Sequence, residues 1–421
     1  MDQPTDQPTD QTPAQPAHQP TAQSTALPFP FPGTGDTGPL EIAEEFARLR
    51  GNCPVARVRF ATGDSGWLVT RYDDVRTVLT DSRFSRAAAA LPGAPRMRPL
   101  AADAATILSM DPPEHTRLHK LVARAFGKKQ IERLRPFVER TAEDLVAVIE
   151  ETGPPADLVA GLGLPLPLAV ICHLLGVPFA DRDRFCRWAD VMLSLGTHSP
   201  EQVQAARDGL AGYLAELIEA KRRAPGDEDL LAMLISAREA GDRLSERELV
   251  VFGVTLLIAG YHTTSSTLAG GALQLLRRPG LTDRIRGDQQ RIRTTVEEIL
   301  RYSTAGVNGG TIRVATEDVE LSGVLVRAGE AVLPAITSAN RDETVFADAA
   351  GFDPGREDNP HLAFGLGVHY CLGSQLARLE LTVALDKLLA RLPRLRLAVP
   401  EAELTCTPGV IRNLTALPVE W

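Results

Sequence analysis

The spacing of apolar residues divides the chain into a long helical part flanked by two shorter β-rich parts. The first part is typical of a helix at 41–50, a hairpin of strands at 55–60 and 67–71, and a short helix at 72–79. From Pro113 to about Tyr302 the spacing is mostly helical. Breaks are expected near the prolines at 154, 178, 200, 225 and 279.

Strand-like runs return after the helical part, at 311–315, 319–321 and 332–336. Residues 340–370 form a long irregular stretch, which a compact domain usually keeps only for function. We therefore expect a mainly α protein with small β portions, folded as a single domain.

The first 33 residues differ in composition from the rest. They are rich in Pro, Gln, Thr and Asp, and Asp-Gln-Pro-Thr occurs twice, at 2–5 and 6–9. Such a segment offers too little apolar surface to fold. We predict a disordered tail over 1–33 and one globular domain over 34–421.

Composition and charge narrow the class of protein. The net charge of −9 argues against general nucleic-acid binding. Five scattered cysteines fit a reducing cytoplasm better than a disulfide framework, and no secretory signal is visible. The apolar run 158–180 contains three prolines, which favours a broken buried helix over a membrane span. We expect a cytoplasmic protein without a membrane anchor.

One cysteine lies between a glycine-rich loop and a predicted amphipathic helix. Cys371 follows the run Phe364-Gly365-Leu366-Gly367. Unpaired N–H groups and the helix dipole at such a junction favour the thiolate form of a cysteine. The glycines let the backbone approach a flat group closely. Cys371 is therefore a candidate axial ligand of haem iron, with a small buried hydrophobic residue as the alternative.

The segment from Phe364 to Gly373, Phe-Gly-x-Gly-x-His-x-Cys-x-Gly, closely resembles the haem-thiolate loop of the cytochrome P450 family. The resemblance runs from about Leu40 to the C-terminus. It implies the single-domain P450 fold, with haem b held between an oxygen-binding helix and the cysteine loop. Cys371 would bind the iron, and Phe364, Gly365 and Gly373 would lie at the haem.

The stretch LLIAGYHTTSS, residues 256–266, resembles the oxygen-binding helix of this family. Small residues leave space beside the helix, and a threonine hydroxyl can bond to the carbonyl four residues earlier and open a local gap. The resemblance places Ala259 and Gly260 over the haem and Thr263 beside the dioxygen. Without the cysteine loop, an ordinary buried helix would explain the same residues.

His262 departs from the family pattern, which has an acidic residue at this position. That acid is thought to relay protons in the family. A histidine can relay protons because its pKa lies near neutrality, but it cannot supply a fixed negative charge. We hypothesise that proton delivery depends on His262, on water or on a hydroxyl of the substrate.

Other motifs match family elements that support and anchor the haem. Glu298 and Arg301 are three residues apart, and with Arg356 they resemble the network behind the cysteine loop. As an exposed pair they would matter little. The resemblance assigns the propionates to Arg313, His369, His115 and His119. His119 replaces the usual arginine and offers fewer donors, which suggests weaker or more pH-dependent anchoring.

The resemblance also implies the redox partners and the pocket. A set of basic residues is spaced to lie on one side of a helix: Arg117, Lys120, Arg124 and Lys128. They could form a docking site for an acidic ferredoxin, and the alternative is a charged face exposed to solvent. The family pocket would be lined by the loop 87–98 and by apolar residues on three segments. These are Val254, Ile258, Val307 and Ile411.

The expected reaction is insertion of one oxygen atom from O2 into a bulky natural product. A roomy aliphatic pocket favours a macrolide or other polyketide, as in antibiotic biosynthesis. Electrons would come from NAD(P)H through ferredoxin reductase and ferredoxin, and we expect a monomer. The alternatives are a peroxide-using or non-oxygenating haem-thiolate enzyme, and a catalytically silent haem-binding protein.

Overall fold

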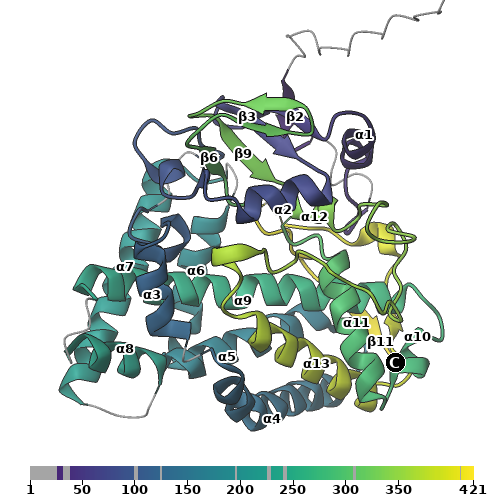
Figure 1. The fold of residues 1–421 in the computed structure, drawn as a ribbon. Coiled ribbons are helices and arrows are strands. Elements are labelled where there is room, and N and C mark those ends of the chain that lie inside the picture. Colours follow the sequence, from purple (N-terminus) through teal and green to yellow (C-terminus); the bar gives the residue numbers. More distant parts are fainter. Residues whose placement is uncertain are drawn as a thin grey trace, which may run out of the picture.

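The computed structural model describes most of the chain. The described residues are 26–31, 38–98, 103–123, 126–194, 197–224, 229–239, 244–306, 310–407 and 409–421. Figure 1 shows the larger sheet at one end of the molecule and the bulk of the helices at the other. The expected mainly α single domain is confirmed.

The helical part holds most of the helices that the apolar spacing predicts. The described α-helices are α1 (Glu44–Asn52), α2 (Tyr72–Thr80), α3 (Glu114–Ala123), α4 (Lys128–Thr152), α5 (Pro165–Leu175), α6 (Arg182–Leu193), α7 (Pro200–Arg223), α8 (Leu230–Glu239), α9 (Glu246–Leu276), α10 (Leu281–Ile285), α11 (Gln289–Tyr302), α12 (Ile336–Ala339) and α13 (Ser374–Arg391). Pro200 begins α7, and Pro279 follows α9, as proline's missing N–H favours.

The strands form one larger sheet and two small ones. The six-stranded sheet has the order β1 (Leu27–Phe29), β2 (Val55–Phe60), β3 (Ser65–Val69), β9 (Ala331–Pro334), β6 (Arg313–Ala315) and β4 (Phe84–Ser85). The expected hairpin is β2–β3, antiparallel, with Val58 opposite Gly66. The small sheets contain β10 (Arg396–Leu397), β11 (Pro418–Glu420) and β5 (Ala156–Asp157), and β7 (Val319–Leu321) with β8 (Val324–Val326).

Helix α9 crosses the middle of the molecule and organises the helical core (Figure 1). The Ser245 side chain accepts a hydrogen bond from the Glu248 backbone N–H, and the Glu248 carboxylate accepts one from the Ser245 backbone N–H. This capping box fixes the start of α9. Helix α9 packs against α5, α7, α11 and α13. By length and composition α9 could cross a membrane, but 67% of its apolar window is buried inside the molecule, as in a core helix.

Two expectations about local structure need correction. The predicted disordered tail overlaps β1, which pairs in parallel with β2, and Phe29 and Phe31 are buried in the core. The other residues of 1–33 lie outside the described part. The basic residues expected along one helix are divided, because α3 ends at Ala123 and Lys128 begins α4.

Candidate active site

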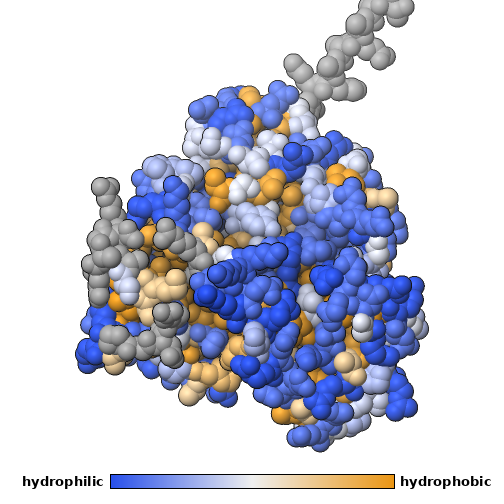
Figure 2. Space-filling view, turned by 60° about the horizontal axis from the view of Figure 1, so that its bottom comes forward, coloured by the Kyte–Doolittle hydropathy of each residue, from blue (hydrophilic) through white to orange (hydrophobic). Residues whose placement is uncertain are grey.

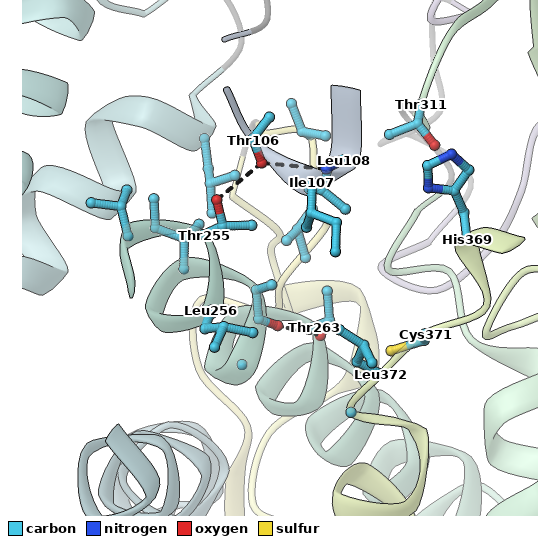
Figure 3. A pocket seen from close by; sticks show the side chains of 18 of the residues that line it. Thr106, Ile107, Leu108, Thr255, Leu256, Thr263, Thr311, His369, Cys371 and Leu372 are labelled. Carbon is cyan, nitrogen blue, oxygen red and sulfur yellow. Dashed lines mark hydrogen bonds between the residues drawn. The ribbon is translucent and has the colours of Figure 1, made fainter. Parts of the chain in front are cut away.

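A cavity of about 1610 Å³ lies between α9 and the loop that carries Cys371. Its wall includes parts of α3, α7, α9 and α13, the loop after β4 and the segments on either side of β6. Figure 3 shows Thr263 on α9 and the sulfur of Cys371 directed into the same space. The structure therefore brings together the two segments that sequence similarity assigned to oxygen binding and iron ligation.

Backbone hydrogen bonds shape the loop around Cys371. The Cys371 N–H donates to the Phe364 carbonyl over 2.9 Å, which closes the loop on itself. Gly365 and Gly367 adopt φ values of 70° and 74°, a region that favours glycine. A Cβ on Gly367 would lie 2.9 Å from the Leu79 carbonyl oxygen, so only glycine fits against α2.

The acidity of Cys371 differs from the sequence-based prediction. Burial raises the pKa of this thiol, although the backbone N–H of Gly373 opposes the change. The helix begins only at Ser374, so Cys371 lies before the helical turn whose dipole was expected to favour a thiolate. A Cβ on Gly373 would lie 4.0 Å from the Cys371 sulfur, so this side of the thiol is open.

The loop is fixed from behind by a carboxylate that the sequence analysis missed. Glu297 on α11 accepts hydrogen bonds from Arg378 on α13 over 2.7 Å and contacts His361 at 3.0 Å. Burial alone would raise the pKa of Glu297, but these two partners hold it at about 2. Arg378 also stacks over the Phe364 ring at 4.6 Å. Glu297 thus joins both ends of the cysteine loop to α11.

The α9 wall has the predicted small and hydroxyl residues. Ala259, Gly260 and Thr263 line the cavity, and the Thr263 hydroxyl donates to the Ala259 carbonyl over 3.2 Å. Gly260 has a second function in packing, because a Cβ there would lie 2.7 Å from the side chain of Ile171 on α5. The space expected beside Gly260 is therefore filled in part by Ile171.

His262 faces away from this cavity. It is buried, and its Nε2 lies 3.3 Å from a carboxylate oxygen of the exposed Asp190 on α6, outside hydrogen-bonding geometry. Burial lowers the pKa of His262 to about 4, so the ring is neutral near pH 7. His262 is not one of the described residues that line the cavity.

Cationic and imidazole side chains gather at one end of the cavity. His115, His119 and His369 all line it, with the His115 ring 4.3 Å from His369 and 5.5 Å from His119. Burial lowers the pKa of all three, that of His369 to about 2. Arg313 lines the same end, and burial lowers its pKa to about 10.

Arg86, which the sequence analysis did not select, completes this group. It is buried and lines the cavity, and burial followed by the charge of Arg313 lowers its pKa to about 9. Its backbone N–H donates to Asp111 over 3.0 Å. No motif marked Arg86, because only the folding of β4 beside β6 places it next to Arg313.

The predicted supporting residues form one buried network. Arg301 donates to Glu298 over 2.7 and 2.8 Å, and both side chains are fully buried. Arg301 also donates to the carbonyls of Asn340, Ala349 and Gly351. Arg356 reaches Glu298 over 3.3 Å. The network attaches α11 to the irregular stretch that precedes the cysteine loop.

The predicted pocket residues have different outcomes. Val254, Ile258 and Ile411 line the cavity, whereas Val307 lies outside the described residues. Glu380 on α13 also lines it and was missed. Glu380 is buried, its Oε2 has no hydrogen-bond partner in the described part of the chain, and burial raises its pKa well above the usual range. The sequence feature that could have identified Glu380 is an acidic residue within the otherwise apolar face of α13.

The proposed ferredoxin patch is weaker than the sequence suggested. Arg117 forms an ion pair with Glu248, at the start of α9. Arg124 lies outside the described residues. Lys120 and Lys128 are on separate helices, so they do not form a stripe on a single helix face.

Known proteins share this fold and much of this sequence. A profile of the family "Cytochrome P450" matches residues 183–394. The chain is 49% identical to nocardicin C N-oxygenase of Nocardia uniformis subsp. tsuyamanensis, over 93% of this chain and 98% of that protein. It is 44% identical to mycinamicin IV hydroxylase/epoxidase of Micromonospora griseorubida, with the same two coverages.

The solved structures agree with these relatives. The structure of the putative thioether synthase SgvP superposes with a TM-score of 0.90 at 42% identity, over 94% of this chain and all of that one. This protein belongs to the cytochrome P450 family. Its enzyme class is that of the P450 monooxygenases, which are oxidoreductases with a haem-iron cofactor.

The residues present fit a haem. The cavity has one thiol, Cys371, facing it, and a thiolate is the iron ligand of P450 enzymes. The His369 Nε2 and Arg313 Nε atoms are buried and make no hydrogen bond with any described residue. Arg86 adds a second buried guanidinium, so this end of the cavity suits two anionic propionates.

Proposed function

We propose that this protein is a haem b monooxygenase that inserts one oxygen atom from O2 into a bulky natural product. The observation that carries the proposal is a single cavity lined by both Cys371 and Thr263. Relatives named for N-oxygenation and for macrolide hydroxylation and epoxidation support it. We favour a macrolide or other polyketide, in a pathway of secondary-metabolite or antibiotic biosynthesis.

The bound haem supplies the oxygen-activating chemistry, and the protein supplies its ligand, its anchoring and the path of protons. Cys371 would hold the iron, with Phe364, Gly365 and Gly373 shaping the loop around it. His115, His119, His369, Arg313 and Arg86 would hold the propionates. A neutral imidazole offers one donor, whereas the two arginines supply the fixed positive charge.

Thr263 and His262 would divide proton handling between the two sides of α9. The Thr263 hydroxyl lines the cavity and donates its one proton to the Ala259 carbonyl in this structure. To give that proton to a reacting oxygen, the hydroxyl would turn from Ala259 into the cavity and then take a proton back from water. His262 lies behind it beside Asp190, which is exposed to solvent. We propose that Asp190 and His262 form the outer part of the proton path, with water carrying protons between them and the cavity.

Redox partners and cellular location follow from the same class. We propose electron supply from NAD(P)H through ferredoxin reductase and a ferredoxin, a cytoplasmic location, and a monomeric protein with no nucleic-acid partner. The P450 relatives and the burial of α9 support these proposals.

A non-oxygenating haem-thiolate reaction is the second candidate. Two observations favour it: the similarity to a putative thioether synthase, and a histidine where the family has an acid. Such a reaction would form a bond between two parts of the substrate and leave no atom of O2 in the product.

Isotope labelling separates the candidates. The holoenzyme is supplied with NAD(P)H, ferredoxin reductase, ferredoxin and a macrolide panel under 18O2. One 18O atom per product, with none from labelled water or peroxide, supports monooxygenation, whereas an unlabelled oxidised product supports the second candidate. In His262→Ala we expect lower coupling of NAD(P)H use to product, and unchanged turnover and coupling would remove His262 from the proton path.

A further inference from the structure

Two threonines from distant segments form a hydroxyl pair in the cavity wall. Thr106 precedes the short helix η2 (Ile107–Ser109), and Thr255 is on α9. Their hydroxyl oxygens are 3.0 Å apart, and both residues line the cavity. Figure 3 shows this hydrogen bond in the same view as Thr263 and Cys371. A substrate in the cavity would therefore meet the pair.

The two hydroxyl protons have a defined direction. The Thr255 Oγ1 lies 2.7 Å from the Val251 carbonyl oxygen, closer than its 3.0 Å contact with Thr106. A hydroxyl has one proton and a carbonyl oxygen can only accept, so the Thr255 proton goes to Val251. Thr106 must then supply the proton of the bond between the two threonines. Donation runs from Thr106 to Thr255 and from Thr255 to Val251.

Only acceptor capacity is left on the two oxygens. A hydroxyl oxygen can accept two hydrogen bonds. Thr255 accepts one from Thr106, and Thr106 accepts one from the Leu108 N–H over 3.4 Å. Each oxygen keeps one open acceptor position, while both protons are used inside the protein. A ligand gains a hydrogen bond here only if it brings its own O–H or N–H.

The pair is held in place by further bonds of the same segment. The Thr106 N–H donates to the Asp103 carbonyl over 3.1 Å. The Asp103 carboxylate accepts hydrogen bonds from the Ala105 N–H over 2.9 Å and from Arg247 on α9 over 3.2 Å. The segment is thus attached to α9 at Arg247 as well as at Thr255. Preorganised acceptors lose less conformational entropy when a ligand binds than mobile ones do.

The neighbours of the pair along both segments are aliphatic. Val251 and Val254 on α9 and Ile107 and Leu108 after Thr106 line the same cavity. Figure 2 shows apolar side chains gathered on the half of the molecule that holds α3, α7 and α8, whereas the other half is mainly hydrophilic. A ligand O–H that leaves water for apolar surroundings loses free energy unless it finds an acceptor. The pair supplies that acceptor.

The pair lies at a defined distance from the residue assigned to oxygen binding. Thr255 and Thr263 both line the cavity and are about two turns apart on α9, which is about 12 Å along the helix axis. A substrate held at the pair would bring to Thr263 a carbon roughly that far from its donor group.

We propose that Thr106 and Thr255 form a specificity site that accepts a hydrogen bond from an O–H or N–H of the substrate and sets which carbon lies near Thr263. This inference rests on the proposed function and narrows it, since the natural product would carry a free donor group about 12 Å from the oxidised position. A substrate with only an ether or ester oxygen at that place would find no donor at the pair.

The test compares decan-1-ol with nonyl methyl ether on the holoenzyme. The two probes have the same number of non-hydrogen atoms, but only the alcohol can donate a hydrogen bond. Dissociation constants from equilibrium dialysis should show that the alcohol binds about three- to tenfold more tightly, the range expected for one hydrogen bond.

The direction of the bonds predicts different results for the two threonines. Thr255→Val removes an acceptor and frees the Thr106 proton for the ligand, so the preference for the alcohol should disappear or reverse. Thr106→Val leaves Thr255 bonded to Val251 with its acceptor positions open, so a preference for the alcohol should remain. Thr106→Ser keeps the hydroxyl and should behave as the wild type.

Thr267→Val is the matched control, because Thr267 is on the same helix, lines the cavity and has its hydroxyl 3.3 Å from that of Ser303. It should leave the preference unchanged. A wild type that binds the ether as tightly as the alcohol would overturn the inference. A preference that survives in Thr255→Val, or that is lost equally in Thr267→Val, would also overturn it.

The outcome is separate from that of the proposed reaction, because binding is measured without turnover. A wild type that prefers the alcohol but incorporates no 18O would contradict only the proposed reaction. Incorporation of 18O without the preference would contradict only the specificity site.

Discussion

His262 and Thr263 are adjacent in sequence but lie in different environments. Thr263 is exposed to the cavity, whereas His262 is buried between α9 and α6 beside Asp190. A helix turns by about 100° per residue, which separates neighbours in this way. The sequence identified Thr263 as a match to the family pattern and His262 as a departure from it, but which side each residue faces depends on the packing of α6.

The buried imidazole of His262 predicts a pH dependence of stability. Its pKa is about 4 in the folded protein and about 6.5 when unfolded, so the unfolded chain binds the proton more readily. The contribution of neutral His262 is complete above pH ~6.5 and is lost as the pH falls to ~4, by up to about 3 kcal/mol.

Urea unfolding of wild type and His262→Gln at pH 7.5 and pH 4.5 measures this effect. The wild type should lose more stability between these pH values than the variant, because only the wild type has this histidine. Equal losses would contradict the low pKa. His115, His119 and His369 are present in both proteins, so their titration cancels in the comparison.

At the scale of elements, α9 and α5 pack closely at a glycine. A Cβ on Gly260 would lie 2.7 Å from Ile171, whereas one on Gly270 in the same helix would lie 3.5 Å from Leu40. Gly260→Ala should therefore destabilise the protein by about 1–3 kcal/mol. Gly270→Ala is the control and should be neutral or stabilise by up to ~1 kcal/mol, since alanine is the better helix former.

The cause of the Gly260→Ala effect can be separated from general damage to α9. Ile171→Ala removes the side-chain atoms that the new Cβ would meet, so the double variant should cost less than the sum of the single ones. Additive losses in thermal unfolding would show that the clash is not the cause.

The junction between α11 and the segment before the cysteine loop depends on a buried ion pair. Glu298→Ala leaves Arg301 and Arg356 without their carboxylate partner, and we expect a loss of about 3–5 kcal/mol. The exposed pair of Glu132 and Arg135 has the same three-residue spacing, so Glu132→Ala is the control and should cost under ~1 kcal/mol. Similar unfolding midpoints for the two variants would contradict this difference.

At the scale of the whole molecule, the helical part was predictable but contacts between distant segments were not. Periodicity located the hairpin and most helices, because those signals are local. The run around Leu27 and Phe29 was assigned to a tail because the first 33 residues as a whole are rich in Pro, Gln, Thr and Asp and offer little apolar surface. As β1 it lies at the edge of the sheet, where proline is tolerated.

In the candidate site, too, residues within local motifs were predictable, whereas residues brought in from distant segments were not. Cys371, Thr263 and the Glu298 network were visible in motifs, since each has a fixed spacing. Arg86 and Glu380 have no such motif, and they reach the cavity only because the segment after β4 and helix α13 converge on it. Their chemistry depends on burial and on like charges, which a sequence does not display.

The central claim is that Cys371 holds the iron of a haem in this cavity. Iron-edge X-ray absorption of the purified holoenzyme tests it directly, because a sulfur neighbour of iron is distinguished from nitrogen and oxygen by its longer bond of about 2.3 Å, as in metal–thiolate sites. We predict one iron per chain with one sulfur neighbour, lost in Cys371→Ser and kept in Cys53→Ser. A sulfur neighbour that persists in Cys371→Ser, or is absent from the wild type, would contradict the account.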